Sequence, residues 1–300
     1  MLRLWGVRDF RHPLFNSGVE VIRALTDHRF SERIFGEQVY LQTRSGLRYR
    51  EIDTYSRSTQ NGENHRDICL ASFAELGLPL TTPVTIPDGS LSLQDLLRDS
   101  IENFDIKQRE LAWTAIAYVL YLAPHQEWTN RYGESFTFDD LANALIQTPF
   151  RQVSCGGAHL LYAQTILRRV DSLTMCLSDS VREALIQHLR EAVIAIVESQ
   201  HEEGYWTLEW HNALKRSSDA NDGASGKELE ARLVATGHLL EWLELLPVED
   251  QPSAEVFRRA ARWICGTLGQ NFQEAKNPDG FCPRVHALCA VRGLICVEYE

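Results

Sequence analysis

The segment VSCGGAHLLYAQTIL, residues 153–167, places Cys155 and His159 four residues apart at the start of an apolar stretch. A thiolate and an imidazole one helical turn apart are two of the ligands that zinc accepts in proteins. Cys282 and His286, in FCPRVHAL, repeat this spacing near the end of the sequence. The repetition makes zinc the candidate metal, and buried cysteines with capping histidines are the alternative explanation.

A third pair of candidate ligands precedes another apolar stretch, where HRDICLAS brings Asp67 and Cys69 two residues apart. Zinc accepts carboxylate, thiolate and imidazole ligands together and can keep a position open for substrate. The candidate metal ligands are therefore Asp67, Cys69, Cys155, Cys282 and His286.

A histidine stands at or just before the start of several apolar, helix-forming segments. These histidines are His65, His159, His238 and His286. If the four helices run in the same direction, their histidines gather at one end of the fold and form a candidate catalytic group. Each histidine has an alternative role as a capping or packing residue.

Glu241 lies inside the apolar segment TGHLLEWLELL. A buried carboxylate is costly without a partner, and His238, three residues earlier, shares its helical face. Such a pair can act as an acid or a base, or it can be a satisfied pair in the core. We therefore count Glu241 among the candidate catalytic residues.

Aromatic side chains that can bind a sugar face or a prenyl chain occur in the segments 127–136 and 201–211 and along the apolar helices. The candidate substrate-binding residues are Trp128, Tyr132, Tyr162, Trp206, Trp210, His211 and Trp242. Trp206 also has a structural interpretation. In QHEEGYW, residues 200–206, the glutamine and the aromatic can tie a helix end to the following turn, and the glycine allows the tight bend.

Helical periodicity dominates from residue 65 onward. It predicts helices over residues 92–104, 109–124, 137–149, 158–170, 178–200, 228–247, 253–272 and 284–299. Amphipathic helices alternate with helices that are apolar on every side, and the latter must be surrounded by other helices. This repeat of helix pairs predicts an all-α fold, an α/α toroid of inner and outer helices.

The first 64 residues are the least regular part of the sequence. We expect residues 1–64 to form an irregular segment packed on a toroid of residues 65–300. A Ser-Gly pair at 45–46, flanked by β-branched and aromatic residues, predicts one short hairpin within that segment. Residues 79–90, PLTTPVTIPDGS, are expected to form a proline-rich connection.

Three segments resemble known toroid families. QHEEGYW matches the Q-x3-G-x-W motif of squalene and terpene cyclases. CGGAHLLYAQTILRRV resembles the Gly-Gly entry to an inner helix of protein prenyltransferase β subunits. RVHALCAVRGL resembles the helix that carries their zinc-binding histidine, with His286 at the matching position. The resemblance spans about residues 105–300 and implies the toroid fold more strongly than any activity.

The sequence also departs from these families at their functional motifs. It contains no D-x-D-D motif of the cyclases. Its only Asp-x-Cys is Asp67–Cys69, which lies in the first repeat, whereas prenyltransferase β subunits carry theirs late in the chain.

The charge, hydropathy and cysteine content of the sequence argue against several classes of function. The net charge of −11 argues against sequence-independent binding to nucleic acid, which needs a basic face. No stretch approaches 18 consecutive apolar residues and the start lacks the apolar core of a signal peptide, so we expect no membrane span. Seven cysteines without a C-x-x-C motif favour buried thiols and a cytoplasmic location.

Two functions remain open at this point. No complete catalytic motif is present, which favours a toroid that binds a small molecule or a glycan in a central cavity. The alternative is an enzyme that acts on an isoprenoid or a polysaccharide in that cavity, with zinc as its candidate cofactor.

Overall fold

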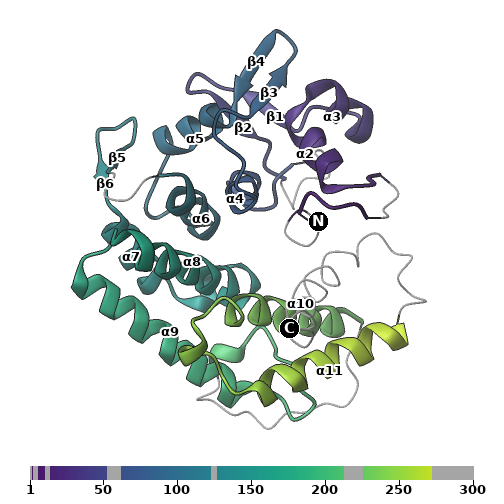
Figure 1. Ribbon diagram of the computed structural model, residues 1–300, viewed down its shortest axis with the longest axis vertical. Coiled ribbons are helices and arrows are strands. Elements are labelled where there is room, and N and C mark those ends of the chain that lie inside the picture. The colour runs from purple at the N-terminus through teal and green to yellow at the C-terminus, as the bar shows by residue number, and fades with distance from the viewer. Residues whose placement is uncertain are drawn as a thin grey trace. The chain divides into compact units, whose positions relative to one another are not determined.

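The computed structural model describes residues 2, 6–10, 14–52, 62–122, 127–212 and 226–271. These ranges are mostly helical and contain three two-stranded hairpins (Figure 1). The chain divides into two compact units, Met1–Leu145 with Val170–Ser178 and Ile146–Arg169 with Asp179–Glu300. Over the described ranges, every helix is too short or too polar to span a lipid bilayer.

The first unit combines short helices with the hairpins. Its helices are α2 (Gly18–Thr26), α3 (His28–Phe35), α4 (Ile68–Glu75), α5 (Leu93–Glu102), α6 (Leu111–Tyr121) and most of α7 (Phe138–Gln147). Its strands are β1 (Tyr40–Gln42), β2 (Leu47–Tyr49), β3 (Pro83–Ile86), β4 (Gly89–Ser92), β5 (Trp128–Thr129) and β6 (Ser135–Phe136).

The prediction of a mostly helical fold is confirmed. The arrangement of these helices as a toroid of inner and outer pairs is not confirmed.

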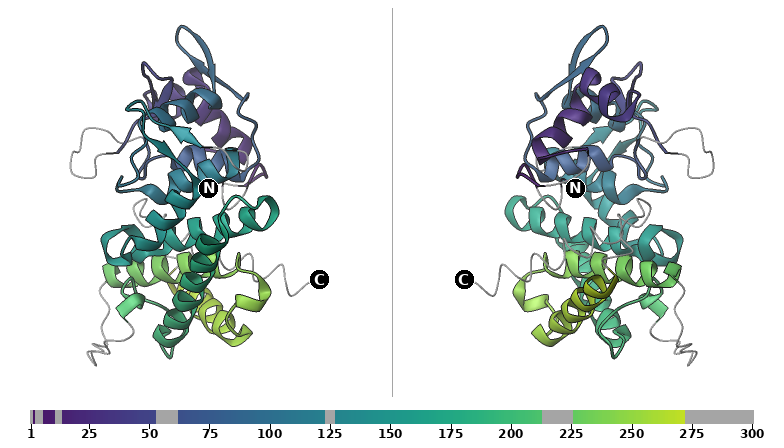
Figure 2. Two further views of the ribbon diagram at one scale, coloured as in Figure 1. Left: turned by 90° about the vertical axis from the view of Figure 1, so that its left-hand side faces the viewer. Right: turned by 90° about the vertical axis from the view of Figure 1, so that its right-hand side faces the viewer.

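The hairpin predicted around Ser45 and Gly46 is confirmed, because β1 and β2 pair antiparallel on either side of that turn. The proline-rich connection expected at residues 79–90 is instead mainly a second hairpin. In it β3 pairs antiparallel with β4, and Pro87 and Asp88 form the two-residue turn. The turn of this hairpin projects from the first unit (Figure 2), whereas β3 packs against α2 and α3.

Residues 18–35 are helical rather than irregular, which corrects the expectation for the N-terminal segment. The hydroxyl of Ser17 accepts a hydrogen bond from the backbone N–H of Glu20 and thereby caps α2. Asp27 ends α2, and its carboxylate accepts the N–H groups of Arg29 and Phe30 at the start of α3. Capping by Ser17 and Asp27 therefore sets the starts of two short amphipathic helices.

Helix α6 is the internal helix of the first unit, as its apolar sequence predicts. Every residue from Leu111 to Val119 is buried. Helix α4 packs along it and contributes Phe73, which is fully buried. Phe104 and Trp128 stack edge to face with ring centroids 5.5 Å apart and close one end of this core.

The second unit is built from longer helices. They are α8 (Ala158–Thr174, whose last turns belong to the first unit), α9 (Asp179–Ser199), α10 (Gly226–Leu243) and α11 (Ala254–Asn271). Four short 3-10 segments accompany them: η1 (Phe150–Gln152), η2 (Ser154–Gly157), η3 (Trp210–Asn212) and η4 (Val248–Asp250). All four long helices lie where the sequence predicts them, and the helix predicted at 284–299 lies outside the described residues.

The structural interpretation of the QHEEGYW motif is confirmed. The side-chain amide of Gln200 donates to the carbonyl oxygens of Gly204 and Val256, at 3.0 and 2.9 Å. The indole N–H of Trp206 donates to the carbonyl of Ile196 at 2.8 Å. These bonds fasten the end of α9 to the turn and to the start of α11.

One buried carboxylate joins three elements of the second unit. Asp250, on η4, forms ion pairs with Arg168 of α8 and Arg190 of α9, and only 5% of its side chain is exposed. Burial raises the pKa of Asp250, but hydrogen bonds and charge from Arg190 and Arg168 lower it by more, so the net shift is downward.

Asp250→Asn is expected to lower the free energy of unfolding of the second unit by about 3 kcal/mol, because a partly buried arginine pair loses its counter-charge. The matched control is Glu255→Gln, since Glu255 also pairs with two arginines but is 52% exposed. Its expected change is under about 0.5 kcal/mol. Urea unfolding measures both, and equal effects of the two substitutions contradict the prediction.

The same carboxylate gives a pH dependence. Its pKa is lower in the folded state, so its contribution to stability is fully present above the unfolded value of about 3.9 and is lost as the pH falls below it. The difference in stability between the wild type and Asp250→Asn should therefore be constant near neutral pH. It should shrink below about pH 4.

Candidate functional site

A left-handed turn opens helix α8. Cys155, Gly156 and Gly157 all have positive φ, at 54°, 60° and 83°. A Cβ added to Gly156 would lie 2.3 Å from the carbonyl oxygen of Leu208, and one added to Gly157 would lie 2.4 Å from the Phe150 ring. Both positions therefore require glycine. The strained conformation of Cys155 is held in place by its surroundings.

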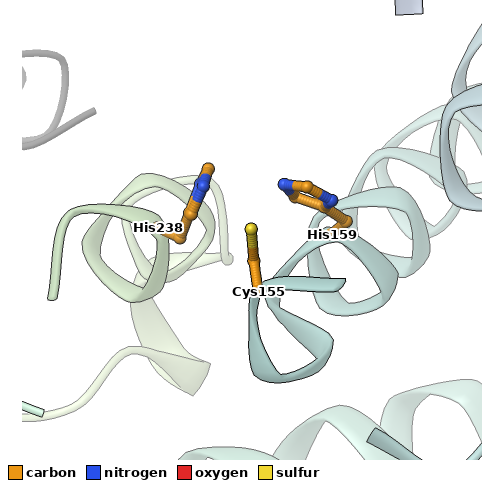
Figure 3. A group of neighbouring side chains, drawn as sticks. All are labelled: Cys155, His159 and His238. Carbon is orange, nitrogen blue, oxygen red and sulfur yellow. The ribbon is translucent and has the colours of Figure 1, made fainter. Parts of the chain in front are cut away.

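This turn brings Cys155 together with two buried histidines (Figure 3). His159 lies in the first turn of α8 and is 6% exposed, and His238 lies in α10 and is 4% exposed. Their rings meet edge to face with centroids 4.8 Å apart. One ligand atom from each of the three residues, a sulfur and two nitrogens, lies within 4.8 Å of the others. The cluster lies entirely within the second unit.

A carboxylate supports one of these imidazoles. Nδ1 of His238 lies 3.0 Å from Oε2 of Glu241, one turn further along α10, and 3% and 8% of the two side chains are exposed. The pair expected from the sequence is therefore present. Burial and then the charge of Glu241 raise the pKa of Glu244, a further turn along, to about 8.

An aromatic layer packs against the left-handed turn. The indole N–H of Trp210 donates to the carbonyl of Gly156 at 2.9 Å. The ring centroid of Phe150 lies 5.0 Å from that of Trp210, 6.3 Å from that of His211 and 5.6 Å from that of His188. Burial lowers the pKa of both histidines, which favours neutral rings against Phe150. Trp210 and His211 thus support the turn that positions Cys155.

The other predicted aromatic residues are distributed over both units. Trp206 and Trp242 are fully buried in the second unit, and Tyr162 on α8 is half-buried. Trp128 is buried in the first unit against Phe104. Tyr132 is 70% exposed, with the guanidinium of Arg131 over its ring.

His65, Asp67 and Cys69 lie in the first unit. Nδ1 of His65 lies 3.0 Å from a carboxylate oxygen of Glu110. The carboxylate of Asp67, whose φ is 62°, accepts hydrogen bonds from the hydroxyls of Ser100 and Thr114 at 2.8 and 2.6 Å. These contacts give His65 and Asp67 structural partners within their own unit.

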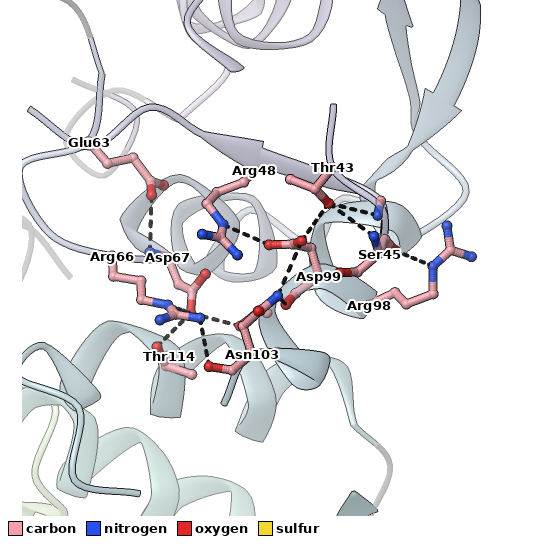
Figure 4. A network of polar contacts seen from close by, with 12 residues as sticks. Thr43, Ser45, Arg48, Glu63, Arg66, Asp67, Arg98, Asp99, Asn103 and Thr114 are labelled. Carbon is pink, nitrogen blue, oxygen red and sulfur yellow. Dashed lines mark hydrogen bonds and ion pairs between the residues drawn. The ribbon is translucent and has the colours of Figure 1, made fainter. Parts of the chain in front are cut away.

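Sequence reasoning missed two buried carboxyls beside Asp67 (Figure 4). Glu63 is 4% exposed and accepts the backbone N–H groups of Asp67 and Cys69. Burial, followed by the charge of Asp67, raises the pKa of Glu63 to about 8. Burial also raises the pKa of the Cys69 thiol well above its ordinary value, which disfavours the thiolate that zinc requires.

Asp99, the second of these carboxyls, is 2% exposed and lies on α5. It accepts hydrogen bonds from the Thr43 hydroxyl at 2.6 Å and from Nε of Arg48 at 2.8 Å. These two bonds connect the β1–β2 hairpin to α5. In the sequence both acids resemble ordinary surface residues, because neither follows an apolar pattern that reveals its burial.

Cys282 and His286 lie outside the described residues, so the second C-x3-H pair stays a prediction. Of the four histidines expected to gather, His159 and His238 are neighbours, and His65 belongs to the first unit. Comparison of the chain with protein-family models, curated proteins and solved structures gives no match.

Gly157→Ala is expected to lower the free energy of unfolding by about 2–4 kcal/mol, because the new methyl group meets Phe150 in a left-handed conformation. Gly133→Ala is the control, since Gly133 has nearly the same φ, 80°, and open space where the Cβ would lie. It should cost about 1–2 kcal/mol. Chemical denaturation measures the free energy of unfolding of both variants. An equal loss in the two would show that the Phe150 side chain moves aside without a loss of stability.

Proposed function

We propose that the protein binds zinc through Cys155, His159 and His238 and uses the ion as a Lewis acid toward a ligand in a fourth, open position. The convergence of one sulfur and two nitrogens within 4.8 Å carries this proposal. Tetrahedral zinc with bonds of about 2.0–2.3 Å separates its ligand atoms by roughly 3.3–3.7 Å. Side-chain movements of about 1 Å therefore suffice to close the site around an ion.

The donor set supports zinc over harder cations. Thiolate and imidazole ligands suit zinc, whereas magnesium and calcium prefer oxygen ligands. Three protein ligands with one position left for water or substrate is the pattern of catalytic zinc sites, and four protein ligands is that of structural sites. When bound, zinc supplies an electrophilic centre that polarises a carbonyl or acidifies water.

The residues of the chain have separate tasks in this proposal. The left-handed turn at residues 155–157 holds the sulfur at the start of α8. Oε2 of Glu241 lies 3.0 Å from Nδ1 of His238 and can orient its ring. The buried surroundings of both histidines exclude bulk water from the cluster and strengthen electrostatic interactions there.

We also propose that the helices belong to an α/α toroid whose cavity receives a small molecule or a glycan, an isoprenoid and a polysaccharide being the two candidate substrate classes. The support is the alternation of amphipathic helices with helices such as α6, which is buried on every side. The resemblance of residues 105–300 to cyclases and prenyltransferase β subunits points to the same fold. A crystal structure that shows inner and outer helices running in consistent directions tests it.

A specific observation favours one other function, that of a thiol nucleophile. Cys155 lies three residues before a 17-residue helix, whose N-terminus favours a thiolate, and beside an imidazole that contacts a carboxylate. Cysteine, histidine and an acid in this order form the nucleophile, base and orienting group of many acyl-transfer enzymes. In this alternative, metal-free protein is active toward thiol-directed acyl substrates.

Protein purified without chelators is expected to contain one zinc ion per chain, and Cys155→Ser, His159→Gln and His238→Gln should each lose most of it, because each removes one of three ligands. The measurement is elemental analysis by mass spectrometry. Cys265→Ser and His201→Gln are matched controls from the second unit and should retain the metal.

Two outcomes separate the alternatives. If the wild type carries no zinc and takes none up, the metal proposal is wrong, and rapid alkylation of Cys155 by iodoacetamide then supports the nucleophile. His286→Ala tests the open position. It should retain zinc, and its cobalt-substituted form should change its visible spectrum when azide is added, as the cobalt-substituted wild type should. Loss of metal in His286→Ala identifies His286 as a fourth ligand and excludes the open position.

A further inference from the structure

Three ionisable side chains follow one another along α10 and its C-terminal extension. His238, Glu241 and Glu244 are spaced three residues apart, so they lie along one side of the helix. His238 and Glu241 are almost fully buried and 3.0 Å apart. The surrounding residues Leu239, Leu240 and Trp242 are fully buried and apolar. Two carboxyls in such surroundings require a specific role.

The contact between His238 and Glu241 determines which imidazole nitrogen carries the proton. An ionised carboxylate only accepts hydrogen bonds, so Nδ1 of His238 must be the donor across the 3.0 Å contact. A neutral imidazole that is protonated at Nδ1 carries its basic lone pair on Nε2. A metal requires that lone pair, and carboxylates commonly orient metal-binding histidines from the opposite nitrogen.

We propose that Glu241 is a positioning residue. It fixes His238 as the Nδ1-protonated tautomer and so makes Nε2 the metal-binding nitrogen of that ring. Glu244, one turn further along, is a neutral carboxylic acid in this arrangement. The inference about metal binding rests on the proposed zinc site, whereas the tautomer is a property of the metal-free protein.

Glu244 is the member of the carboxyl pair that keeps its proton. Its Oε1 is buried and has no hydrogen-bond partner among the described residues, a position that an ionised oxygen would occupy at high cost. Burial and the nearby charge of Glu241 raise its pKa to about 8.

The test uses two isosteric substitutions, Glu241→Gln and Glu244→Gln. A glutamine at position 241 can accept or donate a hydrogen bond, so it no longer dictates the tautomer of His238. A glutamine at position 244 mimics a neutral carboxylic acid, so it should leave the site unchanged. Nitrogen-15 NMR of histidine-labelled protein, with His238→Gln to assign the signals, distinguishes a protonated Nδ1 from a protonated Nε2 without any metal.

The wild type and Glu244→Gln should show Nδ1 protonated, and Glu241→Gln should show a mixture of tautomers. A protonated Nε2 in the wild type, or unchanged signals in Glu241→Gln, overturns the proposal. Circular dichroism confirms that each variant is folded. If Glu241→Gln is unfolded, Glu241→Asp replaces it, because its shorter carboxylate should also release the preference.

Zinc affinity gives the second measurement. Competition with a chromogenic chelator should show a 10- to 100-fold weaker affinity for Glu241→Gln, about the effect expected for loss of such a supporting hydrogen bond, and an unchanged affinity for Glu244→Gln. Equal affinities of the wild type and Glu241→Gln overturn the positioning role while the zinc site stands. Failure of the wild type to bind zinc overturns the proposed function, and the NMR result still decides the tautomer.

Discussion

The left-handed backbone at residues 155–157 is the constraint on which the site depends. A cysteine in this conformation is strained by about 1–2 kcal/mol, and such strain persists only where neighbouring groups enforce it. Three neighbours enforce it here. The backbone of Leu208 occupies the space that a side chain at Gly156 would need, and Phe150 occupies the space next to Gly157. The indole N–H of Trp210 donates to the Gly156 carbonyl. These contacts therefore fix the backbone of Cys155 directly before α8.

The histidines meet this sulfur because two helices present them at fixed places. His159 is one turn into α8, and His238 is in the middle of α10, whose packing brings it against η2. Both rings are almost fully buried, with 6% and 4% of the two residues exposed. Placing two imidazoles, a thiol and a carboxylate together in such surroundings destabilises the fold unless the groups satisfy one another or share a ligand.

Many of the helices were predictable, because they coincide with segments whose apolar residues recur at helical spacing. The helices at 158–174 and 179–199 begin within a residue of their predicted starts, and the pairing of His238 with Glu241 follows from helical spacing alone. The helices at 18–26 and 28–35 were not predicted, because each is amphipathic over only two or three turns and is bounded by the caps at Ser17 and Asp27. Asp99 bonds to Arg48, and the backbone N–H of Glu63 donates to the carbonyl of Arg50. Contacts between segments this far apart in the sequence are encoded by no local pattern.

The pair of histidines distinguishes the two chemical explanations of the cluster. A thiol nucleophile needs one imidazole as its base, with an acid behind it, and His238 with Glu241 already fills both roles. His159, whose ring centroid lies 4.8 Å from that of His238, would then have no part in the acyl-transfer scheme. A metal uses both rings in their neutral form and gains affinity from each. The proposed zinc site therefore gives each of the two rings a role, whereas the proposed nucleophile uses only one of them.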